Sequence, residues 1–139
     1  MTGPAVDLEV VGVVLVALGV AHVALPRVLG WQRSLVALAT LDREVNYVHS
    51  YFIGLTCVLW GLFPLVAGGG SLAHNSATTF VLVGATVFWV ARLVVQLVVF
   101  NRHASESAMW RTASVGGTLL WLWIAGAWIW ALCAQLHAR

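Results

Sequence analysis

The sequence has 139 residues, of which 61% are hydrophobic and only 9% are charged, with a formal net charge of +2. Ordinary globular domains carry about 25% charged residues, so this composition is typical of an integral membrane protein. All seven basic residues are arginines, and no basic cluster interleaved with aromatic residues suggests nucleic-acid binding. The lack of lysine also excludes a Schiff-base mechanism, and with it a retinal-type pigment.

Four apolar stretches occupy most of the chain. An α-helix of about 20 residues crosses a hydrocarbon core about 30 Å thick, and each stretch is close to that length. We therefore predict an all-α membrane protein, an antiparallel four-helix transmembrane bundle that forms a single integral membrane domain over residues 1–139. The predicted spans are approximately residues 8–28, 43–67, 79–101 and 113–136.

The first connection between spans predicts a short helix of its own. Trp31, Leu35 and Leu38 recur at helical spacing. We expect Gly30–Ala39 to form an interfacial helix that Trp31 anchors at the membrane surface. The second connection, residues 68–75, is rich in glycine and predicts a flexible loop.

The arginines predict an orientation. Five of the seven lie in or beside the first and third connections, whereas the N-terminal segment and the second connection have none. By the positive-inside rule, both termini face outward and connections one and three lie in the cytoplasm. We expect a bacterial plasma (inner) membrane protein whose partners are the lipid bilayer and other membrane subunits of a redox complex.

The two cysteines predict no disulfide. Cys57 and Cys133 lie at different depths in the second and fourth spans. A separation of about 10 Å exceeds the limit of about 7 Å between Cα atoms that a disulfide can bridge. We expect two free, buried thiols that behave as small apolar side chains.

Polar side chains within the spans lie at similar depths from the predicted cytoplasmic side. At a helical rise of 1.5 Å per residue, His22 lies about 7 Å inside and His49 about 10 Å inside. Gln96 lies about 9 Å inside, Arg92 is one turn deeper, and Thr118 falls in the same band. Ionisable groups at this depth are costly and need a partner, so we expect one polar pocket that opens toward the cytoplasmic leaflet.

Helical spacing gives this polar layer aromatic neighbours. Arg92 and Gln96 are four residues apart and share a face flanked by Trp89 and Phe100. The stripe around the second-span histidine includes Trp60. Glycines in the first two spans would allow close helix contact or the approach of a flat ligand, at positions 12, 19, 54 and 61.

The favoured function is a redox cofactor site, for haem b or a quinone. His22 and His49 would be the axial ligands of a haem iron, since a six-coordinate b-type haem takes two histidines at matched depth. Arg92 would neutralise a haem propionate or donate to a quinone carbonyl. The candidate cofactor-binding residues are His22, His49, Arg92, Gln96, Trp60, Trp89 and Thr118. In architecture alone, the arrangement resembles the four-helix, haem-carrying membrane anchors of respiratory enzymes.

Two alternatives remain for the same residues. One is a non-catalytic membrane scaffold or assembly partner, whose polar layer is a structural hydrogen-bond network worth about 0.6 kcal/mol per bond. The other is a pocket for a lipid-like or small amphiphilic substrate. In that case Arg92 would bind an anionic head group, and His22 or His49 would act as a general base.

Overall fold

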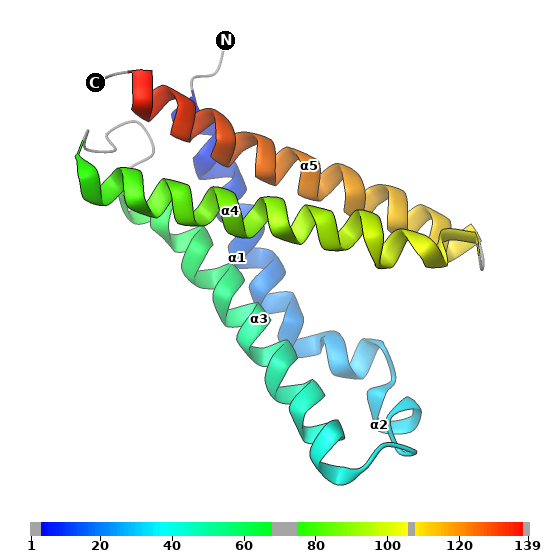
Figure 1. Cartoon of the computed structure of the whole chain (residues 1–139). Helices are drawn as coiled ribbons and strands as arrows, with labels where there is room; N and C mark the ends of the chain where they lie inside the picture. Colours follow the sequence, from blue (N-terminus) through cyan, green and yellow to red (C-terminus); the bar gives the residue numbers. More distant parts are fainter. Residues whose placement is uncertain (1–3, 68–74, 106–107, 138–139) are drawn as a thin grey trace. The chain divides into compact units, whose positions relative to one another are not determined.

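The computed structural model describes residues 4–67, 75–105 and 108–137, and these residues form helices without a strand (Figure 1). The elements are α1 (Pro4–Val28), α2 (Trp31–Ser34), α3 (Thr40–Ala67), α4 (Ser76–Val98), the 3-10 helix η1 (Phe100–Ser105) and α5 (Ala108–His137). Four of them are long and apolar enough to cross a membrane, over Asp7–Val28, Thr40–Ala67, Ser76–Arg102 and Ala108–His137. The prediction of an all-α membrane protein is confirmed.

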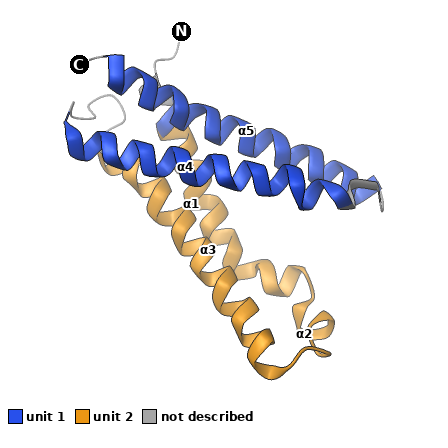
Figure 2. Ribbon diagram, in the orientation of Figure 1, with its two compact units in different colours: residues 1–8, 69–139 blue, residues 9–68 orange. Residues whose placement is uncertain are grey.

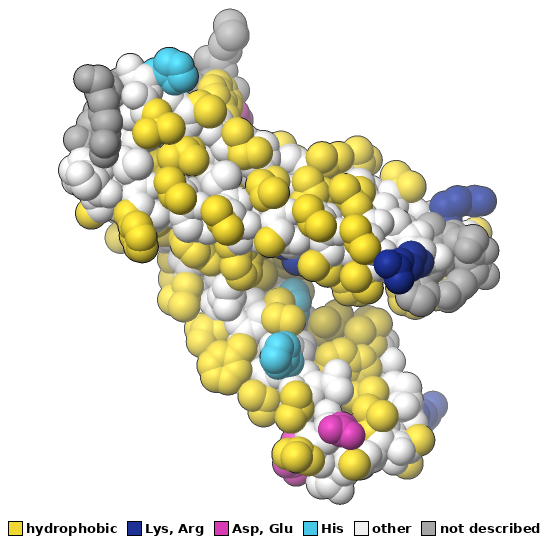
Figure 3. Space-filling view, viewed as in Figure 1, with side chains coloured by type: hydrophobic (Ala, Val, Ile, Leu, Met, Phe, Trp, Pro, Cys, Tyr) yellow, Lys and Arg dark blue, Asp and Glu magenta, His cyan; other side chains and the backbone are white. Residues whose placement is uncertain are grey.

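The surface of the helices is apolar. Only 22–39% of each span's apolar window is buried within the chain, so most of these side chains need lipid around them. Val23, Phe80 and Leu119 are among the large hydrophobic residues that are more than half exposed. Hydrophobic side chains cover much of the visible face of the helices in Figure 3. These features fit an integral membrane protein in a lipid bilayer.

The chain divides into two compact units, one comprising residues 9–68 and the other comprising residues 1–8 with 69–139 (Figure 2). Within residues 9–68, α1 and α3 pack antiparallel as a hairpin, which we call hairpin 1. Within the other unit, α4 and α5 pack antiparallel, and η1 joins them at one end. We call α4, η1 and α5 hairpin 2.

Glycines set the distance between the two helices of hairpin 1. A Cβ atom built on Gly12 would lie 2.7 Å from the carbonyl oxygen of Gly61, and one on Gly19 would lie 2.5 Å from that of Gly54. Both distances are shorter than real Cβ contacts, so only glycine allows the backbones this close. Such contacts bring Cα–H groups against facing carbonyls and increase dispersion contact.

The buried residues of α3 lie along the same line of contact between α1 and α3, which we call the glycine seam. They are small or compact and recur at alternating spacings of three and four, at Ser50, Gly54, Cys57, Gly61 and Pro64. This heptad-like spacing keeps one face of a helix against an antiparallel partner. The close helix contact predicted from the glycines is therefore confirmed.

Two details of the sequence prediction need correction. The interfacial helix was expected over Gly30–Ala39, but α2 is a single turn, Trp31–Ser34. Isolated short helices are marginal, and α3 already begins at Thr40, so the connection offers little room for more turns. Cys57 is free and buried as expected, whereas Cys133 is free but exposed on its helix. Most of the second connection, residues 68–74, lies outside the described residues.

The glycine seam predicts a matched pair of stability changes. Replacing Gly19 or Gly61 by alanine should lower the free energy of unfolding by about 1–3 kcal/mol, because the new methyl group meets the facing backbone. Gly126→Ala is the control, since nothing lies within 4 Å of its built Cβ, and it should be neutral or stabilise by up to about 1 kcal/mol. Unfolding of the full chain in mixed detergent micelles, followed by circular dichroism, measures the free energy of unfolding of each of the three variants. Equal effects at the three positions would contradict the seam.

Candidate functional site

Arg92 of α4 is held by two aromatic rings in hairpin 2. Its guanidinium carbon lies 4.4 Å from the centre of the Trp121 ring and 5.2 Å from that of Phe100. Trp121 in turn stacks on Trp89, with ring centres 5.6 Å apart and planes inclined by 12°. A desolvated cation over an aromatic face gains about 2 kcal/mol, which offsets part of the cost of placing an arginine in an apolar span.

A chain of polar side chains continues from Arg92 toward η1. Nη1 of Arg92 donates to Oε1 of Gln96 over a long 3.5 Å, and Nε2 of Gln96 donates to Oδ1 of Asn101 at 3.3 Å. The same Asn101 oxygen accepts a short hydrogen bond from Ser114 and a 3.3 Å contact from Thr118, both on α5. We call these five residues the Asn101 network.

The Asn101 network joins the three elements of hairpin 2 through one acceptor. Gln96 and Ser114 are buried, so their polar atoms depend on partners inside the protein. Gly117 makes room for the Gln96 amide, because a Cβ built there would lie 3.1 Å from its Nε2. Thr118 also donates to the Ser114 carbonyl at 2.8 Å. The network can act as an internal hydrogen-bond staple between α4 and α5.

A different kind of site lies in hairpin 1. Between α1 and α3 there is a hollow of about 360 Å³, which we call the His22 hollow. Its walls are largely apolar and come from both helices. The lining residues are Gly19, Val20, His22, Val23, Pro26, Tyr47, Ser50, Tyr51, Gly54, Leu55 and Val58.

The hollow begins where the glycine seam ends. Gly19 and Gly54 form the last close glycine pair, and beyond them the helices are separated by His22, Tyr47 and other larger side chains. Pro26 lacks the N–H that would bond the carbonyl of His22, and proline in a helix interior produces a kink. The last turns of α1 bend away from α3 in Figure 1. Side-chain size and the proline together explain the position of the hollow.

The hydrogen bond of the His22 ring selects one tautomer of the neutral imidazole. Its Nδ1 lies 2.8 Å from the carbonyl oxygen of Leu18 one turn earlier. A carbonyl only accepts hydrogen bonds, so Nδ1 carries the proton, and in the neutral ring Nε2 is then the nitrogen with a lone pair. Metal-ligating histidines commonly have this second hydrogen bond. His22 therefore offers the hollow a basic nitrogen that can accept a proton or coordinate a metal.

Ser50 also lines this hollow, with its hydroxyl oxygen buried. Its side chain is 5% exposed, and its Oγ has no hydrogen-bond partner among the described residues. A buried hydroxyl without a partner costs about 1–3 kcal/mol. An apolar hollow with an unpartnered hydroxyl and a histidine nitrogen is suited to a flat, largely apolar ligand that carries a hydrogen-bonding oxygen.

His49 and Trp60 lie elsewhere on α3. At about 100° per residue, His49 is about 140° and Trp60 about 120° around the helix from Gly54, which faces α1. Neither is a lining residue of the His22 hollow, and the His49 side chain is exposed. The structure thus does not bring His49 to the place where His22 faces α3.

The predicted polar layer therefore falls into two groups, each within its own hairpin. Arg92, Gln96 and Thr118 lie together in hairpin 2, as expected from their spacing. His22 lines the hollow of hairpin 1. That the two groups share one pocket stays a prediction.

Four residues were missed in the sequence. Asn101 and Ser114 lie at the ends of predicted spans and were not singled out, although Ser114 and Thr118 are four apart on one helical face. Ser50 was hidden beside the more conspicuous His49. Trp121 could not be assigned to Arg92 from the sequence, because only the antiparallel register of α4 and α5 pairs them.

The Asn101 network predicts a stability loss. Asn101→Ala removes the acceptor shared by Gln96, Ser114 and Thr118, and should lower the free energy of unfolding by about 1–2 kcal/mol at about 0.6 kcal/mol per bond. Thr112→Val is the control, because the exposed Thr112 hydroxyl bonds only within its own helix, and it should change stability by less than about 0.5 kcal/mol. Unfolding curves in detergent micelles give the free energy of unfolding of both variants. Equal losses in Asn101→Ala and Thr112→Val would show that the network contributes nothing to stability.

Comparison with protein-family models, with curated proteins and with solved structures finds no match for this chain. A functional interpretation therefore has to come from the side chains. Two features are relevant to function. One is the His22 hollow, whose lining residues include a histidine and a serine with an unpartnered hydroxyl. The other is the Asn101 network, in which Arg92 lies over the Trp121 ring.

Proposed function

We propose that the chain binds a lipophilic quinone in the His22 hollow, as an electron-transfer or membrane-anchor subunit of a redox complex. The observation that carries the proposal is the pairing of a buried, unpartnered Ser50 hydroxyl with a His22 ring whose Nδ1 proton is already engaged. A quinone carbonyl accepts a hydrogen bond from a hydroxyl. A quinol hydroxyl donates one to a basic nitrogen. Two residues that line the hollow carry one group of each kind.

The size and lining of the hollow agree with such a ligand. Its volume of about 360 Å³ lies toward the lower end of the range of about 300–1,000 Å³ that is usual for small-molecule pockets. Gly19 and Gly54, which are packed against each other, close one edge of the hollow. The remaining walls are mainly apolar, which suits a ligand that arrives from the bilayer.

Haem b fits the same hollow less well. His22 has the Nδ1 hydrogen bond expected of an axial ligand, and Nε2 would coordinate the iron. A bis-histidine haem needs a second histidine on the facing helix, and His49 lies about 140° around α3 from the face toward α1. Haem held by His22 alone is therefore the second cofactor candidate, and the spectrum described below distinguishes it.

The Asn101 network supports the scaffold alternative for hairpin 2. Its hydrogen bonds begin and end on α4, η1 and α5, as in a structural staple.

In a redox subunit, the exposed apolar faces of the helices would contact lipid and neighbouring subunits. We place the protein in a bacterial inner membrane with the first and third connections in the cytoplasm, on the arginine distribution.

The test is cofactor analysis of the full chain purified from membranes in mild detergent. Bound quinone is extracted and quantified by chromatography, and binding of an added short-chain quinone is titrated. Ser50→Ala and His22→Ala should each weaken quinone binding about five- to tenfold, the value of one net hydrogen bond. His49→Ala and Ser34→Ala are the controls and should bind as the parent does, because neither residue lines the hollow.

The visible spectrum of the same samples, oxidised and dithionite-reduced, separates the cofactors. A Soret band that is lost in His22→Ala but kept in His49→Ala would show that the cofactor is a haem with one protein histidine, and not a quinone. A Soret band lost in both variants would establish a bis-histidine haem. A chain that binds no quinone and has a flat visible spectrum would overturn the cofactor proposal and leave the scaffold function.

A further inference from the structure

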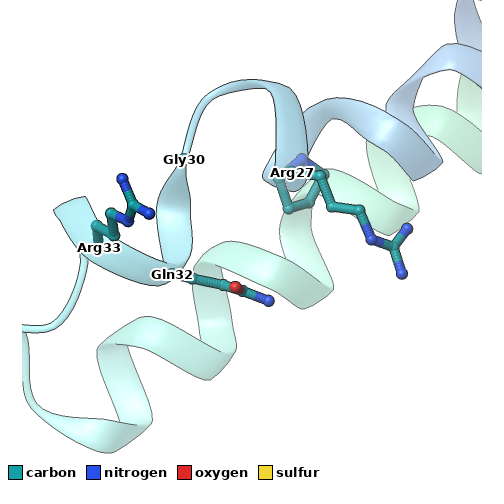
Figure 4. A pocket seen from close by; sticks show the side chains of 5 residues that line it. Arg27, Gly30, Gln32 and Arg33 are labelled. Carbon is teal, nitrogen blue, oxygen red and sulfur yellow. The ribbon is translucent and has the colours of Figure 1, made fainter.

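A second hollow lies where the chain turns from α1 into α2. Its volume is about 510 Å³, and its lining residues are Pro26, Arg27, Gly30, Gln32 and Arg33 (Figure 4). Its lining is polar and cationic, unlike that of the His22 hollow, with which it shares Pro26. We call it the arginine hollow. It is formed within residues 9–68 alone.

Gly30 brings the two arginines to the same hollow. Its φ of 63° is in the left-handed region, which side-chain-bearing residues rarely adopt. The turn is fixed by hydrogen bonds from the Gly30 N–H to the Arg27 carbonyl at 3.1 Å and from the Arg33 N–H to the Gly30 carbonyl at 2.9 Å. The chain therefore reverses between residues 27 and 33, and both side chains line one concave surface.

The arginine hollow carries two positive charges that are not neutralised. No carboxylate lines it, and neither Arg27 nor Arg33 forms an ion pair with another described residue. In Figure 4 the Gln32 side chain lies between the two arginines, and the Arg27 guanidinium extends away from Arg33, as repulsion between like charges favours. Two guanidinium groups and an amide supply many donors, and this combination is suited to a phosphate.

The position of the hollow determines where such an anion comes from. The apolar window of α1 ends at Val28, immediately before the turn. Trp31 packs edge-on against Tyr47, with ring centres 5.7 Å apart, and such aromatic residues gather at the headgroup level of a membrane. Val28 and Leu29 are exposed and apolar, so they face acyl chains. The arginine hollow therefore opens at the depth of the phospholipid phosphates.

We propose that the arginine hollow binds the phosphate of an anionic phospholipid, with Arg33 and the Gln32 amide as donors. The Arg27 side chain, which extends away from Arg33 in Figure 4, would turn toward the phosphate, because the anion removes the repulsion between the two guanidinium groups. Basic pockets beside transmembrane helices bind anionic headgroups through the same chemistry. This site is independent of the cofactor proposed for the His22 hollow, and it adds a lipid specificity that the cofactor does not require.

The full chain is purified in detergent and titrated with phosphatidylglycerol, with phosphatidylcholine and with inorganic phosphate. Native mass spectrometry counts the retained lipids. Each arginine is worth about a fivefold change in affinity, so R27Q/R33Q should bind phosphatidylglycerol about 25-fold more weakly. R27K/R33K keeps both charges but loses the guanidinium geometry, and should lie between the parent and R27Q/R33Q. R102Q/R111Q removes the same charge from the other hairpin and should bind as the parent does.

The lipid titrations distinguish a specific site from diffuse attraction between charges. Preference for phosphatidylglycerol over phosphatidylcholine, lost in R27Q/R33Q and kept in R102Q/R111Q, supports the site. Equal weakening in both glutamine variants would show diffuse attraction to positive charge and would overturn it. Displacement of the lipid by millimolar inorganic phosphate would replace the phospholipid by a soluble anion. If R27Q/R33Q does not fold, binding by R27K/R33K that matches the parent overturns the role of the guanidinium geometry.

Discussion

Inside a bilayer no water is available to hydrogen-bond a buried polar group, and this constraint governs every polar residue in the four apolar helices. Arg92 is the most demanding case, because an arginine at mid-span costs about 2.5–3.5 kcal/mol on insertion scales. The rings of Phe100 and Trp121 lie against its guanidinium group, and the Gln96 amide oxygen accepts a hydrogen bond from it. Much of hairpin 2 can be understood as the surroundings that this one charge requires.

The two hairpins satisfy the constraint differently. In hairpin 2 the donors of Gln96, Ser114 and Thr118 converge on the single Asn101 oxygen, although the Thr86 hydroxyl and the Trp89 indole N–H have no hydrogen-bond partner among the described residues. In hairpin 1 the Ser50 hydroxyl has no hydrogen-bond partner among the described residues, and one His22 nitrogen keeps its lone pair. A closed network stabilises a helix pair. In hairpin 1 the unpartnered hydroxyl belongs to a residue that lines a hollow together with His22, which is why the His22 hollow is the better candidate for function.

The geometry of hairpin 1 follows from residue size. Glycine pairs bring α1 and α3 into backbone contact as far as Gly19 and Gly54. Past that point bulky side chains and the Pro26 kink separate the helices, first at the His22 hollow and then at the turn through Gly30. The two hollows therefore adjoin each other at Pro26. One is apolar and lies beside the span, whereas the other is cationic and lies at its end.

The membrane class, the four spans, the glycine contacts and the shared face of Arg92 and Gln96 could all be predicted from the sequence. These features depend on composition and on the 3.6-residue period, which are local properties. Depth along a helix is also local, and it led to the pairing of His22 with His49. Direction around the helix relative to a neighbour is not local, because it depends on which face packs. The tertiary structure therefore decided that Ser50, not His49, shares the hollow with His22, and that Trp121 and Asn101 meet Arg92 and Gln96.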